Sequence, residues 1–439
     1  MYRRTLVWLL GAGLMAGAVV AAEPQPGENP NPIHLVRRPV APFSAMAKLG
    51  REIFFDASLS SSGEMACASC HSPDHAYGPP NDRPVMLGGP DLTLPGVRAT
   101  PSLTYLERQP EFSIGPEDET KENVDLAKQA EIGKTAARAE KTATQTAQSA
   151  NNIVPQGGLF WDGRANTLQS QAAGPLLDPR EMDGGSIEII AEKLRHASYA
   201  RKFAELFGEN IFQNTNLLVS EAMFAIGRYQ IEEPSFHPYT SKYDYWLEGK
   251  ARLSESEMRG YRLFNDPDKA NCAGCHISQP SRDGWPPLFT DFQYEALGAP
   301  RNLALADTKD PDYFDLGVCG PIRQDFGDQT QFCGMFKTPT LRNTAVRRVF
   351  FHNGVFQTLQ QVMDFYNFRD TNPEKVYPLG ADGKAQKFND IPPKYYANVD
   401  VSDPPFNRHL GDHPAMTAQD EADIIAFVKT LNDGYKPEE

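Results

Sequence analysis

Apolar residues recur at helical spacing in the C-terminal part of the chain. Leu359, Val362, Met363 and Tyr366 stand at i, i+3, i+4 and i+7 after the sequence FFHNGVFQT. Such a stripe is typical of an amphipathic helix that turns one face toward a core. The pattern alone therefore predicts a helix and treats Met363 and Tyr366 alike, as packing residues.

Two further helices have start signals in the sequence. Ser254 and Glu257 have the spacing of a capping box in LSESEMRG, and Thr417 precedes another apolar stripe. That stripe consists of Ile424, Phe427, Val428 and Leu431. Much of the remaining chain is rich in Pro and Gly, with 36 and 34 of these among 439 residues. We therefore expect a mostly α fold with long loops.

The first residues have the pattern of an export signal. Residues 1–22 contain two arginines, a short apolar run and small side chains up to Ala22. The alternative is an uncleaved membrane anchor. No later stretch is apolar enough to span a bilayer. We therefore expect a periplasmic protein without stable membrane insertion once the signal is cleaved.

The segment at about 107–150 differs in composition from its surroundings. It is rich in Ala, Thr, Lys, Gln and Glu and has few large apolar residues. This favours a solvated helix or loop inserted into the first domain, and a partner-docking insertion is the alternative.

The net charge of the chain, -14, disfavours nucleic acid as a ligand and suits a basic protein partner.

The six cysteines fall into three pairs. Two pairs belong to the pentapeptides CASCH, Cys67 to His71, and CAGCH, Cys272 to His276. In C-x-x-C-H the thiols bond the vinyl groups of a haem and the imidazole reaches the iron. The alternatives are a redox C-x-x-C or half a zinc site, but two such motifs in an exported chain favour two covalent haem c groups. The third pair, Cys319 and Cys333, forms either a disulfide or two unpaired thiols.

The two haem motifs follow similar segments. LGREIFFDASLSSSGEMACASCH and MRGYRLFNDPDKANCAGCH share a helix-like stretch with Gly and Arg, a Phe and an acidic turn. This similarity predicts an internal duplication into two cytochrome c-like haem domains. We place them at 23–250 and 251–439.

Residues between the motifs carry a family resemblance. Trp161-Asp162-Gly163-Arg164 is followed by Gln171, Pro175 and Glu181, and RATPSL, TPTLRN and FFHNG occur in the same order. Together they resemble the bacterial di-haem cytochrome c peroxidase superfamily over nearly the whole mature chain. The resemblance makes the 23–250 domain the peroxidatic one and the 251–439 domain the electron-transfer one.

The resemblance also implies roles for single residues. It makes His71 the iron ligand of the N-terminal haem, where hydrogen peroxide reacts, and His276 that of the second haem. Gln171 and Glu181 match residues of the distal pocket, and we assign acid-base chemistry to Glu181 because a carboxylate over the iron can move a proton between peroxide oxygens. Pro175 matches a residue packed beside the open iron face. Trp161 matches an indole between the haems.

The chain departs from the family pattern at three positions. Asp91 stands near where many members place a histidine that closes the first iron, so we expect that iron to be open. Tyr366 lies fourteen residues beyond His352, where those members have a methionine ligand. Tyrosine there resembles the MauG-type branch, and a phenolate favours high iron oxidation states. Ala99 replaces an asparagine ligand of calcium, which weakens the case for that ion.

These observations predict a di-haem peroxidase that takes electrons through the C-terminal haem and works through a bis-Fe(IV)-type intermediate. Its electron donor would be a small c-type cytochrome or another periplasmic carrier. The first alternative is a MauG-like oxidase that modifies residues of a partner protein. The second alternative is a non-catalytic di-haem electron carrier.

Overall fold

The computed structural model describes residues 25–116 and 153–437. The expected signal at 1–22 and most of the expected insertion at about 107–150 lie outside the described residues.

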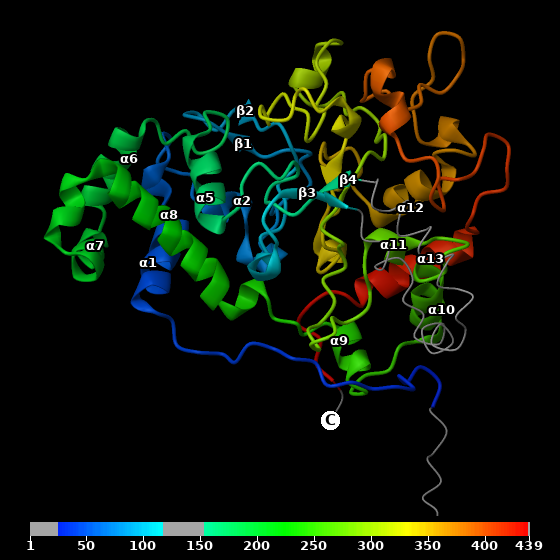
Figure 1. The fold of residues 1–439 in the computed structure, drawn as a ribbon, viewed down its shortest axis with the longest axis horizontal. Helices are drawn as coiled ribbons and strands as arrows, with labels where there is room; N and C mark the ends of the chain where they lie inside the picture. The colour runs from blue at the N-terminus through cyan, green and yellow to red at the C-terminus, as the bar shows by residue number, and fades with distance from the viewer. Residues whose placement is uncertain (1–24, 117–152, 438–439) are drawn as a thin grey trace, which may run out of the picture.

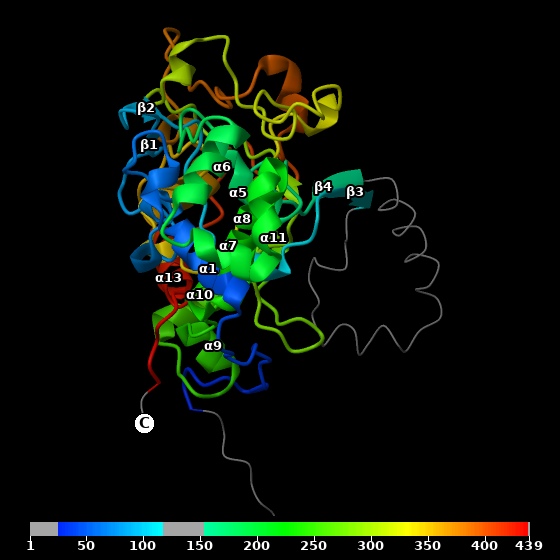
Figure 2. The same cartoon turned by 90° about the vertical axis from the view of Figure 1, so that its left-hand side faces the viewer.

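The described chain is mostly helical with few strands (Figures 1 and 2). Its helices are α1 (Ala45–Phe54), α2 (Cys67–Cys70), α5 (Leu168–Leu177), α6 (Ile187–His196), α7 (Ala200–Phe207), α8 (Thr215–Glu232), α9 (Lys242–Leu247), α10 (Glu255–Phe264), α11 (Cys272–Cys275), α12 (Leu359–Phe368) and α13 (Ala418–Lys429). Its strands form three antiparallel pairs, β1 (Leu87–Gly88) with β2 (Leu94–Pro95), β3 (Ser113–Pro116) with β4 (Ile153–Gln156), and β5 (Tyr294–Glu295) with β6 (Phe336–Lys337). Short 3-10 turns connect many of these elements.

The expected helix starts are confirmed. Ser254 and Glu257 form a capping box at the start of α10, and the Thr417 side chain accepts a hydrogen bond from the third residue of α13. Helix α12 contains the stripe of Met363 and Tyr366 and begins at a Thr358 cap. Satisfied end groups explain why these three helices begin where they do.

Two large apolar clusters form separate parts of the core. The first lies within residues 49–236 and is built by α1, α5, α6, α7 and α8. The second lies within residues 243–431, joined by Leu35, and is built around α9, α10, α12 and α13. Figure 1 shows the first group of helices on the left and the second on the lower right.

A glycine lies at the closest helix crossing in each cluster. On α1, a Cβ at Gly50 would stand 1.8 Å from the carbonyl oxygen of Ala225 in α8. On α10, a Cβ at Gly260 would stand 1.9 Å from the carbonyl oxygen of Asp423 in α13. Each glycine is therefore required because the backbones approach too closely for any side chain.

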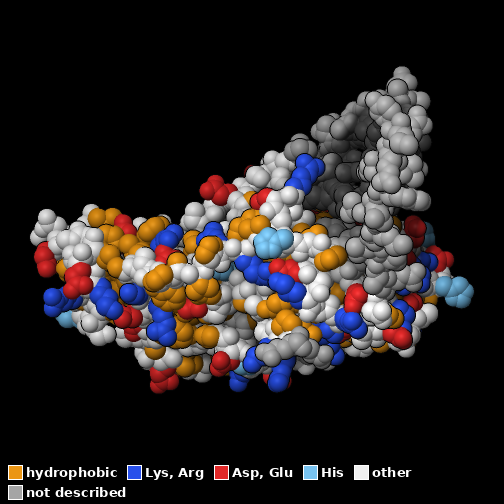
Figure 3. Space-filling model, turned by 90° about the horizontal axis from the view of Figure 1, so that it is seen from below, with side chains coloured by type: hydrophobic (Ala, Val, Ile, Leu, Met, Phe, Trp, Pro, Cys, Tyr) orange, Lys and Arg blue, Asp and Glu red, His pale blue; other side chains and the backbone are white. Residues whose placement is uncertain are grey.

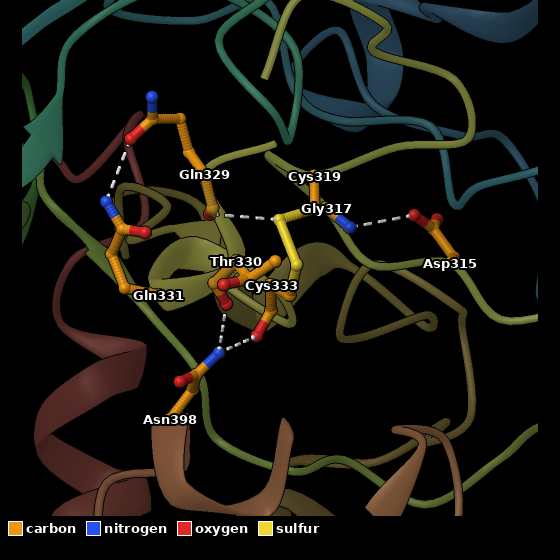
Figure 4. The surroundings of a disulfide bond; sticks show 8 residues. All are labelled: Asp315, Gly317, Cys319, Gln329, Thr330, Gln331, Cys333 and Asn398. Atoms are coloured by element: carbon orange, nitrogen blue, oxygen red, sulfur yellow. Dashed lines mark hydrogen bonds between the residues drawn. A yellow bond between two sulfur atoms is a disulfide. The ribbon is translucent and has the colours of Figure 1, made fainter. Parts of the chain in front are cut away.

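Cys319 and Cys333 form a disulfide (Figure 4). The bridge closes a loop whose ends also join through the backbone, since Gly334 donates to the Leu316 carbonyl at 2.9 Å. Asn398 donates to the carbonyl of Cys333 at 3.0 Å. The alternative of two unpaired thiols is therefore wrong.

Within the described ranges, no helix has the length and apolarity that crossing a bilayer requires. On the face drawn in Figure 3, acidic, basic and hydrophobic side chains are interspersed. The negative net charge of the chain is therefore not gathered into one acidic patch on that face.

Candidate active site

Two one-turn helices, α2 and α11, present the paired thiols of the C-x-x-C-H motifs. Cys67, Cys70, Cys272 and Cys275 are free of disulfides. Burial raises the pKa of Cys67 and of Cys272 to about 12, so these groups are thiols rather than thiolates. In the part of the chain that the structure describes, no three His, Cys, Asp or Glu side chains are grouped to hold a metal ion. The donor set thus fits thioether attachment to a porphyrin better than a zinc site.

The two motif histidines make equivalent hydrogen bonds. His71 Nδ1 lies 3.1 Å from the Tyr77 carbonyl oxygen, and His276 Nδ1 lies 2.9 Å from that of Phe289. Because a carbonyl only accepts, Nδ1 carries the proton and the Nε2 lone pair is left for an iron. Burial lowers the pKa of both imidazoles to about 4, which keeps them neutral.

A large cavity opens beside the second motif. It encloses about 1720 Å³ of space between atoms, part of it open to solvent, and its wall is mainly apolar. Cys272, Cys275 and His276 line it, together with Met363 and Tyr366. A cavity of this size that contains both thiols, the imidazole and a facing helix fits a covalently attached macrocycle.

Tyr366 has an unusual environment for a partly buried tyrosine. Its ring stacks on Phe406 at 5.4 Å between centroids, and burial raises the pKa of its phenol. Its hydroxyl has no hydrogen-bond partner among the described residues, whereas the buried Tyr377 donates to a carbonyl. An unsatisfied hydroxyl in a cavity wall fits a metal ligand. Met363 lines the same cavity, so the geometry alone does not separate the two residues.

Helix α5 and the turn after it carry the residues expected on the far side of the first haem. Gln171 and Pro175 lie one turn apart on α5, and Glu181 follows in the turn. Gln171 is 7% exposed, and its amide makes no hydrogen bond to a described residue. The buried amide is therefore available to a ligand.

Glu181 lies close to the thiols of α2, because its charge contributes to the raised pKa of Cys67 and of Cys70. Burial, and then the negative charge of Asp178, raise the pKa of the Glu181 carboxyl to about 7. A carboxyl with this pKa can both accept and return a proton near neutral pH. The loop of β1 and β2 closes over its backbone, since Gly89 donates to the Glu181 carbonyl at 2.8 Å.

The loop of Trp161 is anchored on both sides. The indole Nε1 donates to the Ala99 carbonyl at 2.8 Å, and the Trp161 carbonyl accepts from the Lys337 backbone at 2.9 Å. Trp161 lines the cavity beside the second motif, while Ala99 begins the segment Ala99-Thr100-Pro101, whose Pro101 carbonyl is near His71. The indole thus contacts structure that belongs to both motifs.

Next to Trp161, Asp162 is completely buried and holds two arginines. Arg98 donates to it at 2.7 Å and Arg164 at 2.9 Å, and Arg98 also binds Asp315. Gly163 has φ of +71°, and a Cβ there would meet the Tyr294 hydroxyl at 2.2 Å. This ion network was missed at the sequence level, although Arg98 opens the RATPSL motif.

A second missed residue is Arg347. Its guanidinium lies beside His71 and donates to the Thr100 carbonyl at 2.8 Å, and burial lowers its pKa to about 10. No carboxylate pairs with it among the described residues, and burial is the only cause of its lowered pKa. A haem propionate would supply the missing negative charge, so this partly buried cation also fits the expected cofactor.

Asp91 and Ala99 are two of the positions at which the chain departs from the family pattern. Asp91 is exposed in the loop between β1 and β2. The Ala99 carbonyl is already bonded to Trp161, and its backbone N–H donates to the His352 carbonyl at 2.8 Å.

Comparisons with known proteins identify relatives over nearly the whole chain. A family model described as di-haem cytochrome c peroxidase matches residues 44–252. Methylamine utilization protein MauG of Paracoccus denitrificans is 31% identical over 407 residues, covering 90% of both chains. Cytochrome c551 peroxidase of Nitrosomonas europaea is 29% identical and covers 83% of this chain and 84% of its own. The crystal structure of the diheme peroxidase BthA from Burkholderia thailandensis is 33% identical, with a TM-score of 0.75 over 93% of this chain and 94% of that one.

Proposed function

The chain belongs to the di-haem cytochrome c peroxidase family of oxidoreductases, and from this premise we propose that it is a periplasmic peroxidase. It would reduce hydrogen peroxide at the haem attached to Cys67, Cys70 and His71. Electrons would enter through the haem attached to Cys272, Cys275 and His276. The carrying observation is the pair of Gln171 and Glu181. Neither side chain has a hydrogen-bond partner among the described residues, and the charge of Glu181 helps to raise the pKa of Cys67 and Cys70 in the first motif.

The two haems would supply the peroxide-binding iron and storage for two oxidising equivalents. The fit of the thiols, imidazoles, cavity and Arg347 supports two covalent groups. Equivalent carbonyl contacts of His71 and His276, and the glycines at both helix crossings, support duplication of one haem domain.

The chain's own acid-base group would be Glu181. Its carboxylate would accept the proton of a bound peroxide and return it to the departing oxygen, which leaves as water. Gln171 would orient the peroxide through its free amide, and Pro175 would keep that face of α5 apolar. Because the pKa of Glu181 is about 7, both protonation states are populated at neutral pH.

Trp161 and Tyr366 would connect and tune the two sites. The Trp161 indole, fixed by the Ala99 carbonyl, would couple the haems electronically. Tyr366 would bind the second iron through its oxygen, which has no competing partner among the described residues. Arg369, whose charge favours the phenolate, would assist the deprotonation that this requires.

A MauG-like oxidase is the second candidate. The 31% identity to a methylamine utilization protein MauG favours it, as does Tyr366. In that case the electrons would come from side chains of a partner protein rather than from a cytochrome. The likeness to a cytochrome c551 peroxidase and to a diheme peroxidase supports the first candidate.

Steady-state turnover separates the candidates. The holoprotein is mixed with peroxide and a reduced small c-type cytochrome, and cytochrome oxidation is followed optically. We expect two cytochromes to be oxidised per peroxide. Failure with every small cytochrome tried, despite reaction of the haems with peroxide, would favour a protein substrate. If the haems do not react with peroxide at all, the non-catalytic di-haem electron carrier is the only alternative left.

Export and calcium are the remaining parts of the proposal. We propose cleavage of the signal after about residue 22, which mass spectrometry of the periplasmic protein checks.

Calcium is not required by the proposal, because Ala99 offers no side-chain oxygen and its carbonyl accepts a hydrogen bond from Trp161. Turnover after treatment with a chelator should therefore stay unchanged.

A further inference from the structure

An aromatic cluster outside the proposed peroxide site leads from the interior to the surface. Tyr105 and Tyr239 are buried, at 3% and 2% exposed, and their ring centroids lie 4.8 Å apart. The ring of Trp285, which is partly exposed, lies 6.4 Å from that of Tyr239. Neighbouring rings at such separations can pass electrons in short steps.

The cluster also touches the second haem site. Leu288 packs against Tyr105 and Tyr239 in one apolar cluster. The next residue, Phe289, provides the carbonyl that lies 2.9 Å from His276 Nδ1. One residue of backbone therefore separates the aromatic cluster from the hydrogen bond of the proposed iron ligand.

Both tyrosines have a proton acceptor in place. Tyr239 donates to Glu107 Oε1 at 2.8 Å, and Tyr105 donates to Asp433 Oδ2. The second oxygen of Glu107 is buried and has no hydrogen-bond partner among the described residues. A phenol that loses an electron becomes strongly acidic, so a carboxylate on the hydroxyl lets the proton leave together with the electron.

A fixed cation favours that proton release. The guanidinium carbon of Arg342 lies 4.9 Å from the ring centroids of both tyrosines. Arg342 is itself fully buried and paired with Asp244. A second positive charge beside it would be costly in a low-dielectric interior. Oxidation of either ring is therefore more favourable when it yields a neutral tyrosyl radical.

We propose that Tyr239 and Trp285 form an electron-transfer route from a surface donor to the second haem, with Glu107 as proton acceptor. This rests on the proposed function, since hydrogen peroxide is the oxidant. Tyr239 gives one electron inward and its phenol proton to Glu107. Trp285 then returns one electron to Tyr239 while Glu107 returns the proton. The donor reduces Trp285, and two such cycles match the two electrons that one peroxide takes.

The surroundings of Trp285 indicate the donor's chemistry. The Arg108 guanidinium lies 5.1 Å from its ring centroid, and Arg282 is exposed nearby, with Asp283 as the acidic neighbour. We infer that the site accepts electron-rich aromatic anions at the surface. The dye ABTS, which carries two sulfonates, is a suitable probe.

The first test needs no peroxide. A ruthenium tris-bipyridine photosensitiser is attached at Arg282→Cys in the holoprotein with reduced haems. A laser flash in the presence of an external electron-accepting quencher oxidises the label, which then draws an electron outward from the haem along the same residues. We expect haem oxidation to slow by about tenfold or more in Tyr239→Phe and in Trp285→Phe, which corresponds to about 1.4 kcal/mol or more of added barrier. Glu107→Gln keeps a hydrogen-bond acceptor but is a weaker base, so it should slow the reaction as well.

Tyr245→Phe is the matched control. Tyr245 is a neighbouring aromatic residue, since Arg37 donates to the Tyr239 carbonyl at 3.1 Å and lies 6.0 Å from the Tyr245 ring. The Tyr245 hydroxyl has no carboxylate partner among the described residues. Its replacement should leave the photochemical rate unchanged. Equal rates in wild type, Tyr239→Phe and Trp285→Phe would overturn the route.

The second test links the route to turnover. The holoprotein is mixed with peroxide alone, and freeze-quenched samples are examined by electron paramagnetic resonance. ABTS oxidation is followed optically in a separate reaction, because oxidised ABTS is itself an organic radical. We expect an organic radical in wild type, and loss of both the radical and ABTS oxidation in Tyr239→Phe. A route seen by photochemistry without any peroxide reaction would contradict the proposed function alone. A peroxide reaction with unaltered radical and ABTS rates in the variants would contradict the route alone.

Discussion

Replacing Glu181 by Gln tests the proposed acid-base chemistry. The change keeps the size of the side chain and removes its ability to take up a proton. Burial and Asp178 raise the pKa of this carboxyl to about 7, so the native group lies where its charge changes near neutral pH. The glutamine amide does not titrate, so its charge does not change with pH.

The expected magnitude follows from these properties. Positioned acid-base groups contribute about 100- to 10,000-fold in rate, so Glu181→Gln should slow the reaction with peroxide by at least about 100-fold. Only the ionised carboxylate accepts the peroxide proton. A group with a pKa of about 7 is about one-tenth ionised at pH 6 and about nine-tenths at pH 8. The native rate should therefore rise through this range, and the rate of the variant should not.

Stopped-flow mixing of ferric holoprotein with peroxide measures this rate through the haem absorbance. Glu188→Gln is the matched control, because Glu188 is an exposed glutamate on α6 away from the motif. It should react like wild type at every pH. An unchanged rate in Glu181→Gln, or a pH profile that survives the substitution, would refute the assignment.

Three further predictions concern other parts of the chain. Tyr366→Phe should change the absorption and magnetic resonance spectra of the second haem, and an unchanged spectrum would return Tyr366 to the role of packing residue. Replacing both Cys319 and Cys333 by Ser should lower the free energy of unfolding in denaturant by about 3 kcal/mol, because the bridge spans a separation of 14 residues. Gly50→Ala should cost about 1–3 kcal/mol in the same assay, because its Cβ would stand 1.8 Å from a carbonyl oxygen. Gly327→Ala, whose Cβ would meet nothing closer than 3.8 Å, should cost far less, and equal losses would contradict the packing argument.

Local features of the fold could be predicted from the sequence because their causes are local. Ser254 and Thr417 cap α10 and α13 within three residues of their own positions. The helix α12 was predicted correctly because the spacing of its apolar residues is also a local feature of the sequence. The sequence could not decide between a disulfide and free thiols at Cys319, because pairing depends on the distance between two backbone segments.

Long-range partners were not predictable. Arg98 binds Asp162 and Asp315 across separations of 64 and 217 residues, and no periodicity carries that information. The pairing of Tyr239 with Glu107 likewise joins residues 132 positions apart in the chain. The reverse holds for Tyr366 and Met363. Both line one cavity, so the count from His352 in the sequence distinguishes them better than the geometry does.

Adding one equivalent of hydrogen peroxide to the resting ferric holoprotein tests the central claim most directly. The visible spectrum is recorded from milliseconds to minutes without any donor. The account predicts a rapid change in the absorption of both haems that persists until two electrons are supplied by a reduced cytochrome. No spectral change under these conditions would contradict an enzymatic role and would leave a protein that only carries electrons.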